Sequence, residues 1–246
     1  MTDSLAGSHL ISAVLSPAIR LWLRSQVQRA EGLQVGITGS DRQLLSGYIP
    51  EVSLAAHQII YQGLHLSQMR VQGGNIRINL GQVLRGKPLR LLEVVPVAVE
   101  LLLTEADLNA SLCSDLLRAG VADLLTKLFQ AQHSLPLPAI PTGSDQVQIH
   151  QSQMAIVSGR VTLEASVIIA NYAPVTIVLQ AGIEMVEGRK LCLVNPCLLD
   201  SFQTTQGRAI AELDGFYIDL GPDVNIHTLS LRDHDLICHG CLNVVP

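Results

Sequence analysis

The chain has 246 residues, of which 48% are hydrophobic, 15% are charged and only 3% are aromatic. Its mean hydropathy is +0.35 and its formal net charge is −5. An average soluble domain is about 25% charged. The chain therefore holds more aliphatic surface than an ordinary core needs. We expect neither a nucleic-acid partner nor a cofactor.

One uncharged run, residues 165–183, is long enough to suggest a membrane span. A turn cluster at 171–174 interrupts it and it is rich in Val and Ile, which predicts a strand hairpin instead of a transmembrane helix. The N-terminus does not resemble a secretion signal, because Asp3 stands where positive charge belongs and Pro17 and Arg20 interrupt the apolar region. The odd number of cysteines, five, fits a reducing compartment. We therefore expect a soluble, cytoplasmic protein.

Charge is distributed unevenly along the chain. Residues 1–92 hold nine Lys and Arg against four Asp and Glu, whereas residues 93–246 hold seven against seventeen. No acidic residue occurs between Val52 and Leu92, the stretch that contains Arg70, Arg77, Arg85, Lys87 and Arg90. Two interpretations remain open, namely a basic end within an acidic protein and a set of solvated loops.

The first half of the chain predicts one helix followed by strands. Apolar residues recur at helical spacing over 8–31, and Ser16-Pro17 suggests a kink or restart there. Strands are expected at 33–37, 52–61, 64–71, 76–80 and 91–103. The alternation changes parity between Leu66 and Met69, which predicts a bulge near Ser67.

A helical pair is predicted in the middle of the chain. Thr104 and Asp107 have the spacing of a capping box, and an apolar stripe at helical spacing follows Ser114. The pair therefore covers 104–133. The next segment, SLPLPAIPTGS at 134–144, is uncharged and rich in proline, and a lid, a strap against the sheet and a linker are all compatible with it.

The second half predicts long antiparallel strands with one apolar and one polar face. Val161, Leu163, Val167, Ile169, Val175, Ile177 and Leu179 should share one face, with Thr162, Glu164, Thr176 and Gln180 on the other. A final hairpin is expected to turn at Asp233-His234-Asp235.

The expected elements make an α+β fold in a single domain over 1–246. Its parts are a helix with the first strands at 8–103, the helical pair at 104–133, the Pro-rich segment at 134–144 and a second strand meander at 145–246.

Several motifs suggest chemistry but lack the residues that it requires. Residues 81–87 match a phosphate-binding loop until Pro88 replaces the Ser or Thr that binds magnesium. Cys238 and Cys241 form a CxxC without a second ligand pair at similar spacing, and in a strand they would face opposite sides. Asp233-His234-Asp235 fits a solvated turn better than a metal site. We assign no residue a catalytic or metal-binding role.

The stretch ITGSDRQLLSGYIPEV at 37–52 places Ser40, Asp41, Arg42 and Ser46 close together between two strand signals. A nucleophile there would need a base and an oxyanion site. Turn chemistry accounts for each of these polar residues. We interpret the stretch as a connection between strands and not as a catalytic loop.

Two segments carry a resemblance to a known family. SDRQLLSGYIPEVSLAAHQIIYQGL (40–64) and LTEADLNASLCSDLL (103–117) resemble the LmeA-like phospholipid-binding family, the first of them its cyanobacterial members. The resemblance extends over most of the chain. It implies a non-enzymatic lipid-binding domain in which a long, strongly curved antiparallel sheet wraps around an N-terminal helix, similar to the tubular lipid-binding proteins. The chain departs from exported members by lacking a recognisable signal peptide.

The resemblance and the aliphatic excess lead to one functional hypothesis. Phospholipid or other acyl chains would lie in a groove, and its expected lining is Leu163, Val167, Ile169, Val175, Ile177 and Leu179. Arg85, Lys87 and Arg90 would face an anionic headgroup or membrane surface, which makes the protein peripheral at a membrane. Two alternatives remain, a scaffold with a filled core and exposed edges for protein partners, and a hydrolase whose site is assembled in space.

Overall fold

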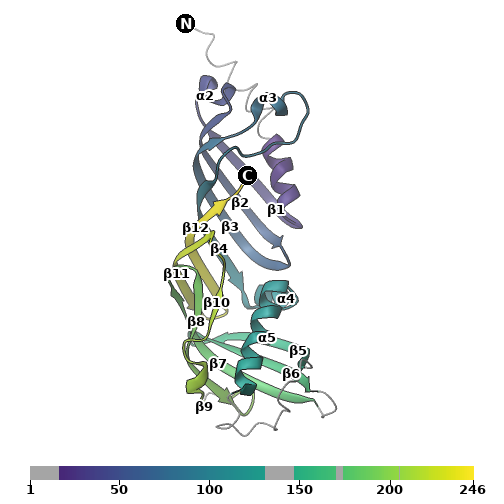
Figure 1. Cartoon of the computed structure of the whole chain (residues 1–246), viewed down its shortest axis with the longest axis vertical. Helices are drawn as coiled ribbons and strands as arrows, with labels where there is room; N and C mark the ends of the chain where they lie inside the picture. Colours follow the sequence, from purple (N-terminus) through teal and green to yellow (C-terminus); the bar gives the residue numbers. More distant parts are fainter. Residues whose placement is uncertain (1–16, 131–146, 170–173, 205) are drawn as a thin grey trace. The chain divides into compact units, whose positions relative to one another are not determined.

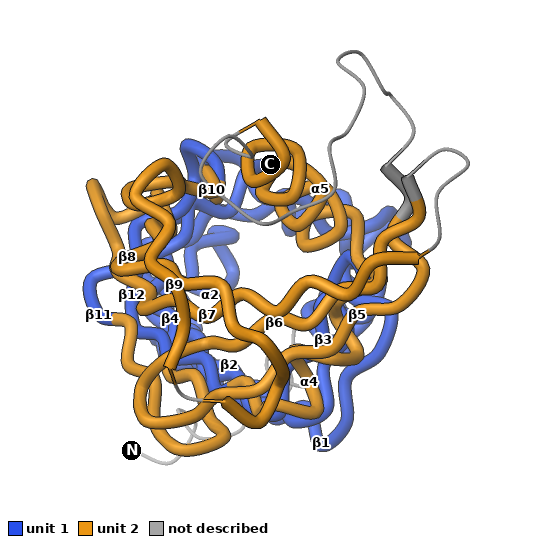
Figure 2. Tube along the Cα trace, turned by 90° about the horizontal axis from the view of Figure 1, so that it is seen from below, with its two compact units in different colours: residues 1–102, 221–228, 238–246 blue, residues 103–220, 229–237 orange. Residues whose placement is uncertain are grey.

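The computed structural model describes residues 17–130, 147–169, 174–204 and 206–246. These residues form an α+β fold in which antiparallel sheets predominate over short helices (Figure 1). The chain divides into two compact units (Figure 2). Unit 1 holds residues 1–102, 221–228 and 238–246, and unit 2 holds residues 103–220 and 229–237. The Pro-rich segment at 134–144 lies outside the described residues.

The first sheet has six strands in the order β1-β2-β3-β4-β12-β11. Their bounds are β1 Arg29–Thr38, β2 Tyr48–Tyr61, β3 Leu64–Arg77, β4 Val95–Thr104, β11 Val224–Arg232 and β12 Asp235–Val244. Two short helices lie in its connections, α2 (Asp41–Leu45) before β2 and α3 (Leu80–Val83) after β3. The strands expected at 64–71 and 76–80 are thus one strand, β3, followed by a helical turn.

The N-terminal helix is shorter at its C-terminal end than expected. Residues 17–26 are helical, and the chain is already in β1 at Arg29, so the expectation of a helix to residue 31 is wrong. The expectation for residues 8–16 falls outside the described part. Ile19 is buried in the unit 1 core, with Trp22 and Leu23 packed against the same cluster. Helical spacing predicted Ala18 and Trp22 on this face but not Ile19 and Leu23. The last residues of the expected helix pair with β2 instead.

The change of parity in β3 occurs without the bulge that was predicted for it. β2 and β3 keep one register from Tyr48 opposite Arg77 to Tyr61 opposite Leu64. The position of Ser67 lies opposite Gln58, whose φ is +48°. The alternation of inward-facing side chains therefore shifts in both strands at Gln58, which has a left-handed backbone conformation. No extra residue is inserted in β3.

Unit 2 contains the helical pair and the second sheet. The helices are α4 (Glu105–Ser111) and α5 (Asp115–Gln130). The sheet has the order β10-β8-β7-β6-β5, with β9 paired to β8. Its bounds are β5 Val147–Val157, β6 Arg160–Ile169, β7 Val175–Val186, β8 Lys190–Leu199, β9 Gly207–Ala209 and β10 Tyr217–Asp219, with the short helix η2 at Ala211–Leu213.

α5 covers one face of the second sheet. Its buried side chains Val121, Leu124, Leu125, Leu128 and Phe129 share a core cluster with Leu163, Ala165 and Val167 of β6 and Ile177 and Leu179 of β7. α4 begins with the predicted capping box, in which the amide of Asp107 donates to Thr104 Oγ1 at 3.2 Å and the amide of Thr104 donates to Asp107 Oδ2 at 2.8 Å. The amphipathic pattern of the helical pair is thus confirmed.

The final hairpin turns at Asp233-His234 as predicted, but it does not continue the second meander. β12 pairs beside β4 in the first sheet, so the expectation of a continuous meander over 145–246 is wrong, and there are two sheets where one was expected. A strand pattern specifies which side chains share a face but not which edge the strand joins, and the open edge of β4 provides the pairing partner here.

Candidate functional site

The first sheet carries an aliphatic face that can be followed strand by strand. Cross-strand pairing places Ile37, Val52, Gly73 and Val97 in one row and Val35, Leu54, Val71 and Val99 in the next. Directly opposite residues point to the same side of a sheet. The two rows therefore form a continuous apolar surface across β1 to β4 without any charged side chain.

The described side chains of this face differ in burial. Val52, Val71, Val97 and Val99 are buried, whereas Val35, Ile37, Leu54 and Met69 are half-buried at its margin. The helical residues 17–26 that pack on the face span about 15 Å. β2 and β3 have 14 residues each, and strands of that length span about 46 Å. The described helix is thus shorter than β2 and β3.

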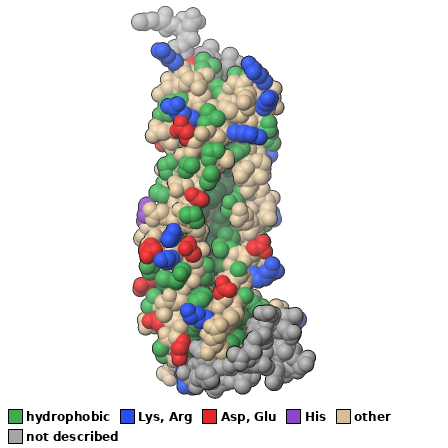
Figure 3. All heavy atoms as spheres, in the orientation of Figure 1, with side chains coloured by type: hydrophobic (Ala, Val, Ile, Leu, Met, Phe, Trp, Pro, Cys, Tyr) green, Lys and Arg blue, Asp and Glu red, His purple; other side chains and the backbone are tan. Residues whose placement is uncertain are grey.

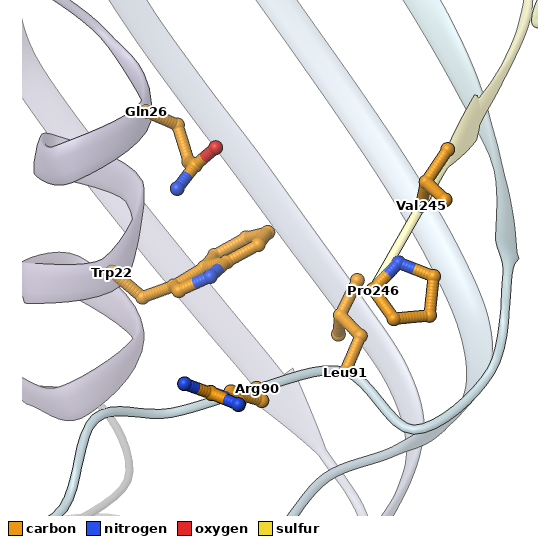
Figure 4. A pocket seen from close by; sticks show the side chains of 6 residues that line it. All are labelled: Trp22, Gln26, Arg90, Leu91, Val245 and Pro246. Atoms are coloured by element: carbon orange, nitrogen blue, oxygen red, sulfur yellow. The ribbon is translucent and has the colours of Figure 1, made fainter.

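A pocket of about 430 Å³ opens beside the helix in unit 1 (Figure 4). Trp22 and Gln26 extend into it from the helix, and Arg90 and Leu91 extend into it from the connection between α3 and β4. Val245 and Pro246 complete its lining. Trp22 is the only tryptophan of the chain. The pocket combines an apolar wall with one guanidinium group, a composition that suits an amphipathic ligand.

Asn79 holds Arg90 in place, a role that the sequence did not reveal. The amide of Arg90 donates to Asn79 Oδ1 at 2.7 Å, and Asn79 Nδ2 donates to the carbonyl of Pro88 at 3.0 Å. The amide of Asn79 donates in turn to the carbonyl of Arg90 at 3.2 Å. In a sequence, an Asn between a strand and a glycine-containing turn indicates only that its side chain bonds to nearby backbone groups. Here the bonds of Asn79 close the loop that carries Arg90.

A second pocket in unit 1, of about 660 Å³, has a polar lining. Tyr48 donates its hydroxyl to Asn75 Oδ1 at 2.5 Å, and Arg77 lies 3.6 Å from Glu93. Its arginine already faces a carboxylate. The second pocket is therefore less suited to an anion or an acyl chain than the first.

The three basic residues singled out from the sequence occur together on the connection from α3 to β4. Arg85, Lys87 and Arg90 are all exposed. Among the described residues, no ion pair involves any of the three, whereas Arg70 and Arg77 face Glu100 and Glu93. Blue side chains gather on the α3 side of unit 1 in Figure 3. The acid-free stretch of sequence thus separates into two paired arginines and one unpaired basic loop.

Five of the six residues expected to line a groove lie on one face of the second sheet, under α5. Leu163 pairs with Leu179, and Val167 pairs with Val175. Leu163, Val167, Ile177 and Leu179 are buried in the cluster with α5, and Val175 is partly buried against it. Ile169 is the last residue of β6, and its side chain lies outside the described part. Side chains of α5 therefore occupy the space next to these buried strand residues.

Two of the remaining polar candidates, His234 and Ser40, have structural partners. Glu105 Oε2 accepts from the amide of Ile156 at 3.0 Å and lies 3.2 Å from His234 Nδ1, which joins α4 to β5 and to the final turn. Gln43 Oε1 accepts from the amide of Ser40 at 2.9 Å at the start of α2, so the 37–52 stretch forms a connection that contains one helical turn. Within the described ranges, no three His, Cys, Asp or Glu side chains are grouped to hold a metal ion.

Comparison with known proteins agrees with the resemblance noted from the sequence. The family model described as LmeA-like phospholipid-binding matches residues 6–241, nearly the whole chain. The chain belongs to the LmeA-like phospholipid-binding family. No curated protein and no solved structure gives a significant match. None of the helices in the described ranges is long and apolar enough to cross a membrane. Membership of the LmeA-like family makes a lipid the first ligand class to consider for the aliphatic face and the Trp22–Arg90 pocket.

Proposed function

We propose that the protein is a non-enzymatic carrier or holder of phospholipid, with the acyl chains on the half-open aliphatic face of unit 1. The observation that supports this most directly is the partial burial of that face beside the helix at 17–26. Val35 and Leu54 remain half-buried although Val71 and Val99 in the same row are buried. In this proposal the first sheet curves around the helix and leaves room for acyl chains beside it.

The energetics favour acyl chains over a polar ligand on this surface. Each methylene buried against apolar side chains contributes about 0.8 kcal/mol, so a single chain of ordinary length can offset the entropy lost on binding. No aromatic box is needed, which fits a chain that is 3% aromatic. The phosphate of the headgroup would lie at Arg90, next to the indole of Trp22, where a guanidinium can donate two parallel hydrogen bonds to phosphate oxygens.

The residues predicted from the sequence provide a second acyl surface. Leu163, Val167 and Ile177 form the sheet side of an aliphatic layer, and α5 packs against them from the other side. An acyl chain would reach them only if α5 moved away from the sheet, whereas the unit 1 face needs no such movement. We therefore place the acyl chains in unit 1 first and keep the β6–β7 face, with Val175, Ile169 and Leu179, as the alternative.

One experiment tests the proposal and discriminates between the two faces. Organic extracts of the purified protein are analysed by mass spectrometry for bound lipid. The protein is then loaded with a phospholipid that carries a photoactivatable group on its acyl chain, and the labelled peptides are mapped. We expect phospholipid in the extract and label on peptides around Leu54 and Met69. Label around Val167 and Ile177 would instead select the alternative face.

Trp22 supplies an independent readout of the same site. Because it is the only tryptophan, quenching of its fluorescence by phospholipid with brominated acyl chains reports on the pocket alone. A protein with no lipid in its extract, no photolabel and no quenching would contradict the proposal. That outcome would leave the scaffold with a filled core as the better description.

The same proposal includes peripheral association with anionic membranes. Arg85, Lys87 and Arg90 have no carboxylate partner among the described ion pairs, so their full charge is available to a negatively charged surface. Basic residues near such a surface contribute about 1 kcal/mol each. Association through these residues would bring the Trp22–Arg90 pocket to the lipid source.

A further inference from the structure

Three leucines are exposed in the part of unit 1 that carries α2 and α3. Leu45 at the end of α2 is 61% exposed, Leu84 at the end of α3 is 61% exposed, and Leu92 before β4 is 58% exposed. Single exposed apolar side chains are ordinary. Three leucines at 58% exposure or more, in segments that lie together, are not accounted for by the unit 1 core.

Hydrogen bonds bring these segments together. The amide of Ile78 donates to the carbonyl of Gly47 at 2.9 Å, which joins the end of α2 to the start of α3. The amide of Leu92 donates to the carbonyl of Arg77 at 2.9 Å, which returns the connection to the same place. Ser46 and Leu92 line one pocket. The leucines therefore belong to neighbouring loops at one end of unit 1, the end where α2 and α3 appear in Figure 1.

The charges around the leucines have one predominant sign. Arg42, Arg85, Lys87 and Arg90 are exposed in the same segments, and Asp41 is the acidic residue of α2. Glu93 follows Leu92, and it faces Arg77 at 3.6 Å. An alternation of exposed leucines with basic side chains that make no ion pair among the described residues is complementary to a bilayer interface, where an apolar layer lies below anionic headgroups.

We propose that Leu45, Leu84 and Leu92 form a membrane-docking tip that inserts into the interface of an anionic phospholipid bilayer, with Arg42, Arg85, Lys87 and Arg90 on the phosphates. The inference rests on the proposed function and deepens it, because it names the surface that meets the membrane. The leucines add an apolar contribution to binding that salt does not screen, and they set the depth at which the pocket with Arg90 meets the headgroups.

The charge pattern favours a bilayer over a protein partner. The fully buried centre of a protein interface is typically depleted in charge and enriched in aromatic residues. This tip interleaves leucines with arginines and lysine, and none of its exposed residues named above is aromatic. A protein partner is therefore the competing outcome of the test.

Vesicle binding by the full chain tests the tip. Sedimentation with vesicles of phosphatidylcholine mixed with phosphatidylglycerol should show binding of the unaltered protein, with weaker binding to phosphatidylcholine alone. Leu84→Ser and Leu92→Ser should each lower binding to the mixed vesicles roughly fivefold to tenfold, as expected for the loss of a partly inserted leucine. Leu116→Ser is the matched control, since Leu116 is an exposed leucine of α5 in unit 2, and it should bind as the unaltered protein does.

Insertion can also be observed directly. In the double variant Leu84→Trp with Trp22→Phe, the new indole should shift its emission to the blue and be quenched by vesicles with brominated acyl chains. An unshifted, unquenched emission, or equal vesicle binding by the Leu84, Leu92 and Leu116 variants, would overturn the inference. The same holds if the unaltered protein binds neither kind of vesicle, which would leave the tip as a protein surface.

The lipid content of the same variants separates the two proposals. If the leucine variants retain phospholipid in their organic extracts but lose vesicle binding, both the docking tip and the lipid site stand. If leucine substitution has no effect on vesicle binding while phospholipid is still extracted, only the docking tip fails. An extract without lipid from a protein that docks through its leucines contradicts only the proposed lipid site.

Discussion

At the scale of single residues, the Cys-His-Gly-Cys motif at 238–241 has a structural explanation. Cys238 is buried in β12, and the odd spacing places Cys241 on the opposite side of the strand, as predicted. A Cβ built at Gly240 would lie 2.5 Å from the carbonyl oxygen of Asn225 in β11. The glycine therefore permits the close approach of the final hairpin, and the cysteine fills space next to it.

Burial of Cys238 predicts a stability change at alkaline pH. Burial raises the pKa of the Cys238 thiol from 9.0 to about 11, because the thiolate is poorly solvated there. The unfolded thiol ionises above pH 9 while the folded one stays protonated. The resulting stabilisation is complete below pH 9 and is lost as the pH rises toward 11. Two pKa units correspond to about 2–3 kcal/mol in the free energy of unfolding.

The measurement is urea unfolding of the unaltered protein and of Cys238→Ala between pH 8 and pH 11. We expect the free energy of unfolding to fall more steeply with pH when Cys238 is present. Cys113 is exposed, so Cys113→Ala should keep the steep dependence and serves as the control. Identical pH profiles for all three proteins would show that the Cys238 thiol is not desolvated.

At the scale of elements, α4 protects the edge of the second sheet. β5 is the last strand of that sheet. Asn109 Nδ2 donates to the carbonyl of Met154 at 2.7 Å, and the amide of Met154 donates back to Asn109 Oδ1 at 2.8 Å. Glu105 accepts from the amide of Ile156. Two side chains of one short helix thus satisfy backbone groups that a neighbouring strand would otherwise pair with, which removes an open edge.

Removal of the Asn109 side chain should expose that edge. Asn109→Ala leaves both polar groups of Met154 without their partner, which should lower the free energy of unfolding by about 1–3 kcal/mol. Hydrogen exchange of the Met154 amide should accelerate more than that of β6 amides. Asn243→Ala, at an exposed position of β12, is the control and should change the free energy of unfolding by less than about 0.5 kcal/mol. Equal destabilisation by the two changes would contradict the edge role.

At the scale of the whole molecule, the uneven charge of the sequence corresponds to one localised cationic loop. Arg70 and Arg77 lie opposite Glu100 and Glu93, so carboxylates in β4 and just before it balance part of the basic charge of the acid-free stretch. Arg85, Lys87 and Arg90 stay exposed and outside the described ion pairs. The sequence left two interpretations open, solvated loops and a basic end. Both describe the same exposed residues, Arg85, Lys87 and Arg90.

Charge reversal should weaken binding to anionic vesicles in a salt-dependent way. Arg85→Glu with Lys87→Glu should lower the affinity at low salt by roughly fivefold or more for each charge. The difference should shrink between about 0.01 M and about 0.15 M salt, because the Debye length falls from about 30 Å to about 8 Å. Arg189→Glu is the control, since Arg189 is a basic residue of unit 2 and lies outside the basic loop of unit 1. A similar loss for Arg189→Glu would mean that no basic end exists.

The sequence by itself determined the periodic features of this protein. Strand alternation predicted that Leu163 and Leu179 share one face, helical spacing predicted the core face of α5, and the capping box at Thr104 marked the start of α4. Two segments were sufficient to recognise the LmeA-like family, which the match over 6–241 supports. These features depend on neighbours within a few residues or on motifs that are written in the chain.

Only the tertiary structure decided which apolar face a helix covers and which polar side chain positions the loop with Arg90. α5 fills the face that the sequence marked most clearly, while Val35 and Leu54 on the less regular face are only half-buried. Asn79 bonds across eleven residues to the amide of Arg90, and β12 pairs with β4 from the far end of the chain. Coverage and pairing depend on contacts between segments distant in sequence, and local periodicity carries no information about them.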